Sequence, residues 1–123
     1  MKTFISAVII GILLVSASTI SDRCIKGFSD EMININKSII EDGKKEDAQS
    51  SVLKMEKLLK ERRIILAGII NHISLDEIEN CITEIKGYAS EGDEKEAKVR
   101  SHKLALLLKR LPEEYGVSIQ NIL

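Results

Sequence analysis

The stretch that decides the fold is residues 22–42, which read DRCIKGFSDEMININKSIIED. Its large apolar side chains recur at spacings of three and four residues: Ile25, Phe28, Met32, Ile35 and Ile39. Because an α-helix has about 3.6 residues per turn, this spacing places all of them on one face. The stretch therefore predicts an amphipathic helix, and Gly43 after it suits the left-handed conformation in which many helices end.

Three further segments carry an apolar stripe at helical spacing: residues 45–70, 75–90 and 93–111. Ser74 and Glu77 stand three residues apart, which predicts a capping box at the start of the third helix. We expect Gly92 to close that helix. We expect Pro112 to end the fourth, because proline lacks an amide proton and clashes with the preceding turn inside a helix.

The four predicted helices form two pairs, each joined by a short turn that contains glycine. The second pair matches the first at an offset of 49 residues, so that Gly43 falls on Gly92 and Ala48 on Ala97. Either a duplication or the sequence features that amphipathic helices have in common explain the match. Both explanations predict an all-α fold, in which a small bundle of two αα-hairpins packs antiparallel, as in TPR proteins.

The N-terminus differs in composition from the rest of the chain. Residues 4–20 carry no charge, and as a helix they span about 26 Å, close to the roughly 30 Å hydrocarbon core of a bilayer. We therefore predict a transmembrane anchor in residues 1–21 and a soluble helical-bundle domain in residues 22–123. The side chains expected to contact lipid include Phe4, Ile9, Ile10, Leu13, Leu14 and Ile20.

A cleaved signal peptide is the alternative reading of this segment. Lys2 would be its basic end, and the small residues around Ala17 offer a cleavage site. Cleavage there would release a secreted soluble helical protein. An uncleaved segment instead predicts a single-pass protein of the cell membrane, and the very short N-terminal stub favours an extracytoplasmic position for the bundle.

Charge restricts the classes of partner. Beyond residue 20 the chain carries 17 basic and 19 acidic residues, a net charge of −2. A nucleic-acid binder needs a basic surplus, so we expect no nucleic-acid partner. The cations of the second and fourth helices are either solvated side chains or a basic interaction face toward anionic lipid or cell-wall polymer: Lys57, Lys60, Arg62, Arg63 and Lys109.

Residues capable of chemistry are few and scattered. His72 and His102 have no second strong metal ligand at helical spacing, and no orienting group or oxyanion loop accompanies Cys81. We therefore expect no enzyme activity, no metal, no cofactor and no small-molecule substrate. Whether Cys24 and Cys81 pair is open. The apolar run at residues 64–70 is too short to span a membrane. It should be buried on more than one side or else contact a partner, and we expect burial.

The chain resembles, over nearly its full length, an uncharacterised bacterial membrane-protein family known as domain of unknown function 4363. Five features carry the resemblance: the lysine-plus-apolar N-terminus, the helix that holds Ile39-Ile40-Glu41-Asp42, the lysine-rich helix at residues 45–70, the Asn71-His72 junction ahead of Glu77-Ile78, and the ending Leu111-Pro112-Glu113 followed by residues 119–123, IQNIL. One departure is that residues 64–66 read IIL where a tryptophan is typical of such sequences. The resemblance implies a single-span membrane protein and assigns no activity or functional residue.

Together these features predict a membrane-anchored, extracytoplasmic helical module that acts by binding, with another membrane protein as its partner. The tether would raise its effective concentration at the surface. We expect a groove between the helices at 45–70 and 93–111, filled by a partner helix or by the tail from Val117 to Leu123.

Overall fold

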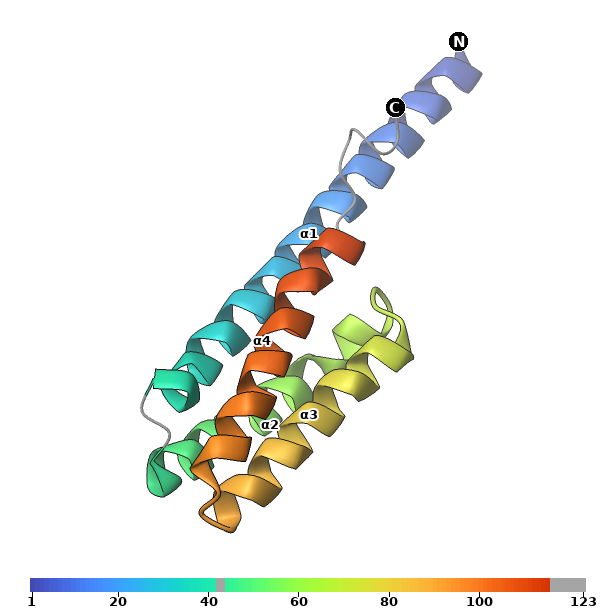
Figure 1. Ribbon diagram of the computed structural model, residues 1–123. Helices are drawn as coiled ribbons and strands as arrows, with labels where there is room; N and C mark the ends of the chain where they lie inside the picture. The colour runs from blue at the N-terminus through green and yellow to red at the C-terminus, as the bar shows by residue number, and fades with distance from the viewer. Residues whose placement is uncertain (42–43, 116–123) are drawn as a thin grey trace.

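The computed structural model describes residues 1–41 and 44–115, except for the side chain of Ser18. Every regular element in these ranges is an α-helix: α1 (Lys2–Glu41), α2 (Lys45–Ala67), α3 (His72–Ser90) and α4 (Glu94–Tyr115) (Figure 1). The predicted all-α class is confirmed. The tail from Val117 to Leu123 lies outside the described residues.

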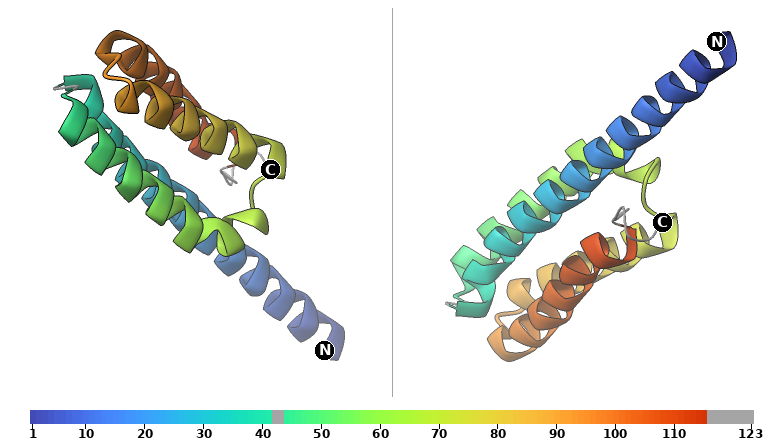
Figure 2. Two further views of the ribbon diagram at one scale, coloured as in Figure 1. Left: turned by 90° about the horizontal axis from the view of Figure 1, so that it is seen from below. Right: turned by 90° about the horizontal axis from the view of Figure 1, so that it is seen from above.

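The helices form a closed four-helix bundle with an extension. Both α1 and α3 pack against α2 and α4, so that α1 and α3 occupy opposite corners, as do α2 and α4. Successive helices run antiparallel, with the α1–α2 hairpin in one layer and the α3–α4 hairpin in the other (Figure 2). The predicted antiparallel hairpins are therefore confirmed, and the contact between α1 and α4 closes them into a bundle.

The first helix joins the apolar N-terminal segment to the bundle without a break. We expected an anchor in residues 1–21 and a new helix from Asp22, but α1 runs through this point from Lys2 to Glu41. Residues 20–24 contain neither proline nor glycine, so nothing in them interrupts a helix. What changes is burial: Ile20 is 62% exposed, whereas Ile25 is fully buried.

The core of the described chain consists of the predicted apolar stripes together with four buried polar residues, Ser29, Asn36, Ser51 and Ser101. Four of the five stripe residues of α1 are fully buried: Ile25, Phe28, Met32 and Ile39. Ile35 is only half-buried, because Asn36 takes the inward place beside it. The Asn36 side-chain NH2 group donates to the Ser101 carbonyl of α4 at 2.8 Å, whereas the Asn36 carboxamide oxygen is buried without a hydrogen-bond partner among the described residues.

The junction between α2 and α3 differs from the prediction. We expected a capping box at Ser74, but α3 begins at His72, and the Asn71 carboxamide oxygen accepts from the Ile73 amide at 3.0 Å. The Ser74 hydroxyl instead bonds the Tyr115 hydroxyl of α4 at 2.8 Å. Asparagine is as good an N-cap as serine, and the earlier start adds most of a turn to α3.

Pro112 lies inside α4 rather than at its end. A proline leaves the carbonyl four residues before it without its helical donor, which here is the Leu108 carbonyl. The Ser29 hydroxyl of α1 donates to this carbonyl at 2.6 Å, and both residues are buried. The neighbouring helix thus supplies the missing donor, and α4 continues to Tyr115. The prediction that Pro112 ends the helix was wrong.

Candidate interaction surface

The exposed half of α1 is the largest apolar surface of the described chain. An 18-residue window of this helix has a mean hydropathy of 2.3, contains at most two charged residues, and is not buried inside the protein. All six predicted lipid-facing side chains are exposed: Phe4, Ile9, Ile10, Leu13, Leu14 and Ile20. By length and composition this helix is able to cross a membrane, and a signal sequence meets the same criteria.

Hydroxyl groups in this half of α1 bond to its own backbone. Ser6 Oγ donates to the Lys2 carbonyl and Thr19 Oγ1 to the Val15 carbonyl, both at 2.9 Å. A polar group in hydrocarbon is costly unless it has a hydrogen-bond partner. These bonds lower the cost of placing the two hydroxyls in lipid.

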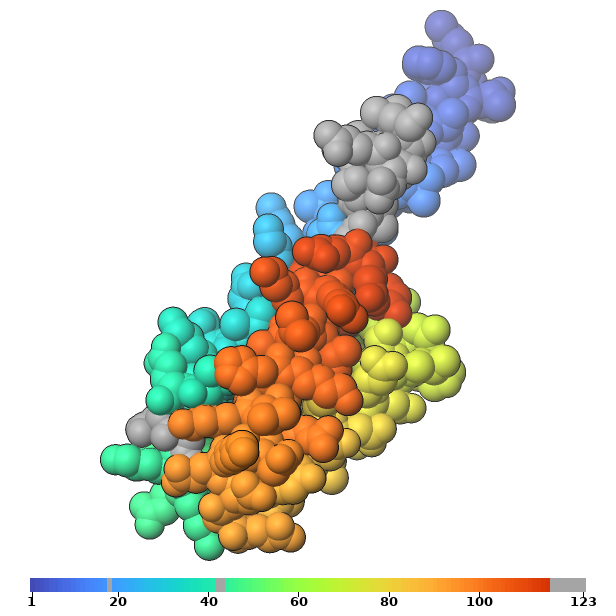
Figure 3. Space-filling model, viewed as in Figure 1, coloured from blue at the N-terminus to red at the C-terminus, as the bar shows by residue number. Residues whose placement is uncertain are grey.

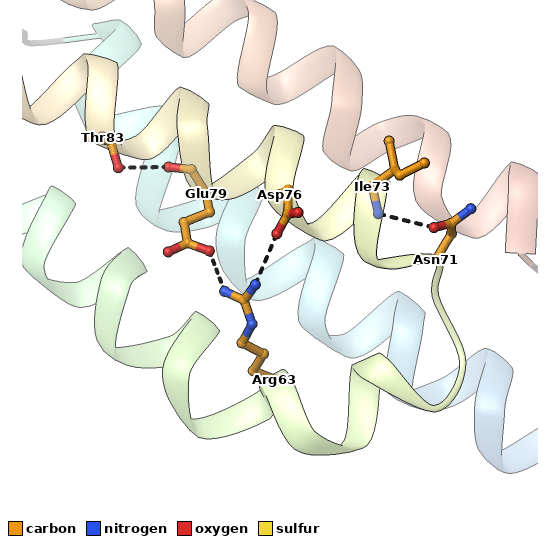
Figure 4. A network of polar contacts seen from close by, with 6 residues as sticks. All are labelled: Arg63, Asn71, Ile73, Asp76, Glu79 and Thr83. Carbon is orange, nitrogen blue, oxygen red and sulfur yellow. Dashed lines mark hydrogen bonds and ion pairs between the residues drawn. The ribbon is translucent and has the colours of Figure 1, made fainter.

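The two arginines of α2 point to opposite flanks of their helix. Arg62 forms an ion pair with Glu31 of α1 at 3.3 Å. Arg63 binds Asp76 at 3.0 Å and also Glu79, both on α3 (Figure 4). The hydrogen bond and charge of Glu79 raise the pKa of the Arg63 guanidinium above its ordinary value. Each arginine therefore joins α2 to a different neighbouring helix.

The remaining cations of the predicted basic face are also dispersed. Lys57 pairs with Glu61 of its own helix at 4.0 Å. Lys60 lines a shallow depression that it shares with the carboxylates of Glu56 and Glu79. Lys109 lies on α4, at the opposite corner of the bundle from α2. The described structure therefore does not gather Lys57, Lys60, Arg62, Arg63 and Lys109 on one face.

The predicted groove between residues 45–70 and 93–111 is closed. Its facing side chains are already in the core: Val52, Met55 and Leu59 of α2, and Leu104 and Leu108 of α4. Because α1 and α3 pack between these two helices on either side, no room is left there for a partner helix. The groove prediction was wrong, since a closed bundle turns both stripes inward.

Neither the two histidines nor the two cysteines of the described chain share a helix. His72 and His102 are exposed on different helices, and no group of three or more His, Cys, Asp or Glu residues arranged to hold a metal occurs among residues 1–41 and 44–115. Cys24 and Cys81 are both unpaired thiols, on α1 and α3 at opposite corners. Burial raises the pKa of the Cys81 thiol and thereby makes it less reactive.

Exposed isoleucines near the α2–α3 junction were not anticipated. We expected the run at residues 64–70 to be buried, and Leu66 and Ile70 are. Ile64, however, is 89% exposed and Ile65 56% exposed, and Ile73 at the start of α3 is 57% exposed. Helical periodicity allows only part of a continuous apolar run to face the core, a signal that was available in the sequence.

A second exposed apolar pair lies on α4. Val99 and Leu106 are 52% and 58% exposed and stand seven residues apart, which places them on one outward stripe. Figure 3 shows that α4 covers the front of the bundle between α1 and α3. This helix face is open to a partner approaching from the side.

Comparison with known proteins gives a family and no activity. No curated protein and no solved structure matches the chain. A family model described as "Domain of unknown function (DUF4363)" matches residues 15–122, which include the end of the apolar segment and the whole of the described bundle. The chain therefore belongs to the family of the domain of unknown function DUF4363.

Proposed function

We propose that this protein is a membrane-anchored helical module that docks onto another membrane protein, with its bundle on the extracytoplasmic side. One observation carries the proposal: α1 is a single helix whose apolar half is entirely exposed and whose other half forms a corner of the bundle. Exposed apolar area of this extent in a soluble protein marks a site of membrane or protein contact.

The uncharged stretch has a length suited to a bilayer. It extends from Thr3 to Ser21, about 28 Å at the helical rise of about 1.5 Å per residue, and tilting or snorkelling side chains absorb small mismatches. Lys2 and Arg23 flank it, and lysine and arginine at such positions extend their charges into the headgroup region. The helix then crosses the membrane once, and the bundle stands on one side of it.

Binding rather than catalysis fits the bundle. Its core is filled by aliphatic side chains, and the depressions on the described surface are shallow and lined largely by charged residues. The outward stripe with Val99 and Leu106 is the face that we assign to the partner, since a helix of the partner that extends out of the same membrane would approach the bundle from the side. The tether raises the local concentration of the module around such a partner.

Membrane fractionation tests the anchor. We expect the full chain to remain in the membrane pellet after extraction at alkaline pH and to retain Met1 on N-terminal sequencing. A soluble product that begins near residue 18 would contradict the anchor and support the secreted alternative.

Topology is tested by labelling a cysteine placed on the bundle. Ser50 is exposed on α2, so a membrane-impermeant maleimide applied to intact cells should label the Ser50→Cys variant above the level of the parent protein. Labelling only after the cells are lysed would place the bundle in the cytoplasm.

Site-specific photocrosslinking tests the docking face. A photoreactive residue at Leu106 should give a discrete protein adduct in native membranes, and one at Leu53, which is equally exposed on α2, should not. The adduct should disappear when residues 1–20 are removed. An adduct that forms equally from both positions would show that α4 is not the docking face.

A further inference from the structure

The end of the bundle nearest the apolar segment carries its own exposed isoleucine. Ile73 lies in the first turn of α3, directly after the turn that joins it to α2 (Figure 4). The side chain of Ile73 is 57% exposed. Ile69, in the turn between α2 and α3, is half-buried. Ile73 lies outside the core, whereas Ile69 packs against the core and is only partly buried; Ile70 and Leu75 on either side are buried.

Two hydrogen bonds between α1 and α4 show which residue of α1 lies at the same height along the bundle axis as the α2–α3 turn. Ser29 bonds Leu108, and Asn36 bonds Ser101, so seven residues along α1 correspond to seven residues backward along α4. A further step of seven places Tyr115 level with Asp22. Because Tyr115 bonds Ser74, the start of α3 lies at this level too, next to the end of the uncharged stretch. In Figure 1 the end of α4 and the α2–α3 turn lie beside the point where α1 leaves the bundle.

The direction of the Ile73 side chain also indicates that it faces the membrane end of the bundle. In a helix the Cα–Cβ bonds lean toward the N-terminus. Ile73, at the N-terminus of α3, therefore leans toward the membrane end of the bundle. Ile64 and Ile65, near the C-terminus of α2, lean away from it. Among the three most exposed isoleucines of this region, Ile73 is thus the one aimed at the bilayer.

We propose that the α2–α3 turn, with Ile73 and Ile69, is a second membrane contact that inserts into the bilayer interface beside the α1 anchor. This inference rests on the anchoring function proposed above. The occupant is the lipid surface because α1 continues without a break from the apolar segment into the bundle, which holds the end of the bundle at the level of the lipid headgroups.

Apolar insertion, rather than charge, drives this contact. Exposed Arg23 and Lys26 lie at this end, but so do the exposed carboxylates of Glu113 and Glu114, so the end has no surplus of positive charge to attract anionic lipid. We therefore expect the contact in uncharged phosphatidylcholine as well as in anionic membranes, and at high as well as low salt.

The consequence is a fixed orientation. A single crossing helix leaves the bundle free to rotate about its axis and to tilt in any direction. Because α3 stands at the corner opposite α1, a lipid contact at its start sets the direction of tilt. The position of each face of the bundle relative to the lipid surface, including the outward face of α4, is then fixed, while the protein as a whole still rotates about the membrane normal.

Tryptophan fluorescence tests this contact directly, since the chain contains no tryptophan. Three variants of the full chain are reconstituted into phosphatidylcholine vesicles, in separate preparations whose lipids are brominated near the top and near the end of the acyl chain: Leu13→Trp, Ile73→Trp and Leu53→Trp. The side chains are similarly exposed, at 62%, 57% and 59%. Glu31 lies nine residues beyond Asp22 along α1, and it pairs with Arg62 of α2. Leu53 lies a further nine residues from Arg62 in the same direction. At about 1.5 Å per residue, Leu53 is therefore about 27 Å farther from the membrane than Asp22.

Quenching of the tryptophans at positions 13 and 73, with none at position 53, supports the proposal. Quenching at 13 alone overturns the second contact and leaves the anchor intact. No quenching at 13 overturns the anchor and the second contact together. Quenching at all three positions also overturns the proposal, since the bundle would then lie flat on the lipid.

Two further outcomes separate lipid from protein as the occupant. In the first, the tryptophan emission of the Ile73→Trp variant is blue-shifted but unquenched, and shifts to the red when residues 116–123 are deleted. The C-terminal segment then covers this site, and the proposal is overturned. In the second, the emission stays blue-shifted and unquenched after the deletion. Another protein chain then covers the site, which overturns the proposal as well.

Discussion

At the scale of single residues, the fold depends on a few hydrogen bonds that helical periodicity does not reveal. The stripe from Ile25 to Ile39 was predictable because it follows from spacing alone. The bonds from Ser29 and Asn36 to carbonyls of α4 were not, because they depend on which helix packs beside α1. The N-cap at Asn71 was missed because Ser74 offered a second, equally plausible cap nearby.

The link between Ser29 and Pro112 gives the first prediction. The Ser29→Ala substitution should lower the free energy of unfolding by about 1–2 kcal/mol, because it leaves the buried Leu108 carbonyl without a donor. The loss should shrink in the Pro112→Ala background, where an amide at position 112 supplies the helical bond. Urea unfolding of the two single variants and the double variant measures this coupling. Additive effects would show that Ser29 does not replace the missing donor, and Ser50→Ala on the exposed face is the control.

The two thiols give a prediction about reactivity. Because burial raises the pKa of Cys81, less of it is thiolate at any pH near neutrality, and its 2% exposure also blocks reagents. In the folded protein at a pH of about 8, close to the ordinary thiol pKa, Cys24 should react first with a thiol reagent, and Cys81 only at the rate at which the bundle opens. Equal labelling rates, measured by mass spectrometry, would contradict the buried position of Cys81.

At the scale of elements, ion pairs join neighbouring helices of the bundle. Ion pairs cross between α1 and α2, between α2 and α3, and between α3 and α4: Arg62–Glu31, Arg63–Asp76, Lys86–Glu56 and Arg100–Glu84. The sequence shows that the third helix is acidic. It does not show which cations pair with these acidic residues, because the spacing of residues within one helix does not tell which neighbouring helix packs against each side. Of the cations of the predicted basic face, Arg62 and Arg63 form ion pairs with neighbouring helices, whereas Lys57 pairs within its own helix.

Two glycines of the second hairpin should respond in opposite ways to alanine. Gly92, between α3 and α4, has a φ of 75°, where a side chain costs about 1–2 kcal/mol. Gly87 lies inside α3, and nothing within 4 Å would meet an added Cβ, so alanine there should stabilise the protein by about 0.5–1 kcal/mol. Thermal unfolding of Gly92→Ala and Gly87→Ala should therefore shift in opposite directions. Shifts of the same sign would contradict the assigned turn and helix.

At the scale of the whole molecule, the protein combines a bundle of ordinary design with a helix that extends out of it. The four-helix class was predictable from periodicity. The closure of the bundle was not, because an apolar stripe shows which face is buried and leaves open whether the last helix returns to the first. That closure excludes the predicted groove and leaves the sides of the bundle and its end nearest the apolar segment as available surfaces.

The bundle should be stable without the extension. No residue of the apolar window is buried in the protein, so a fragment of residues 21–123 should be soluble and helical by circular dichroism, and should unfold cooperatively. A fragment with coil or sheet spectra would mean that the exposed half of α1 contributes to the core after all.

The central claim is that one unbroken helix joins the membrane to the bundle. Hydrogen–deuterium exchange of the full chain in lipid nanodiscs tests it most directly, because amides within a continuous helix exchange slowly and those of a linker do not. The structure predicts protection that continues without a gap from the apolar segment through residues 19–26 into the buried turn at Phe28. Rapid exchange confined to residues 20–24, between two protected segments, would show a hinge there and contradict the claim.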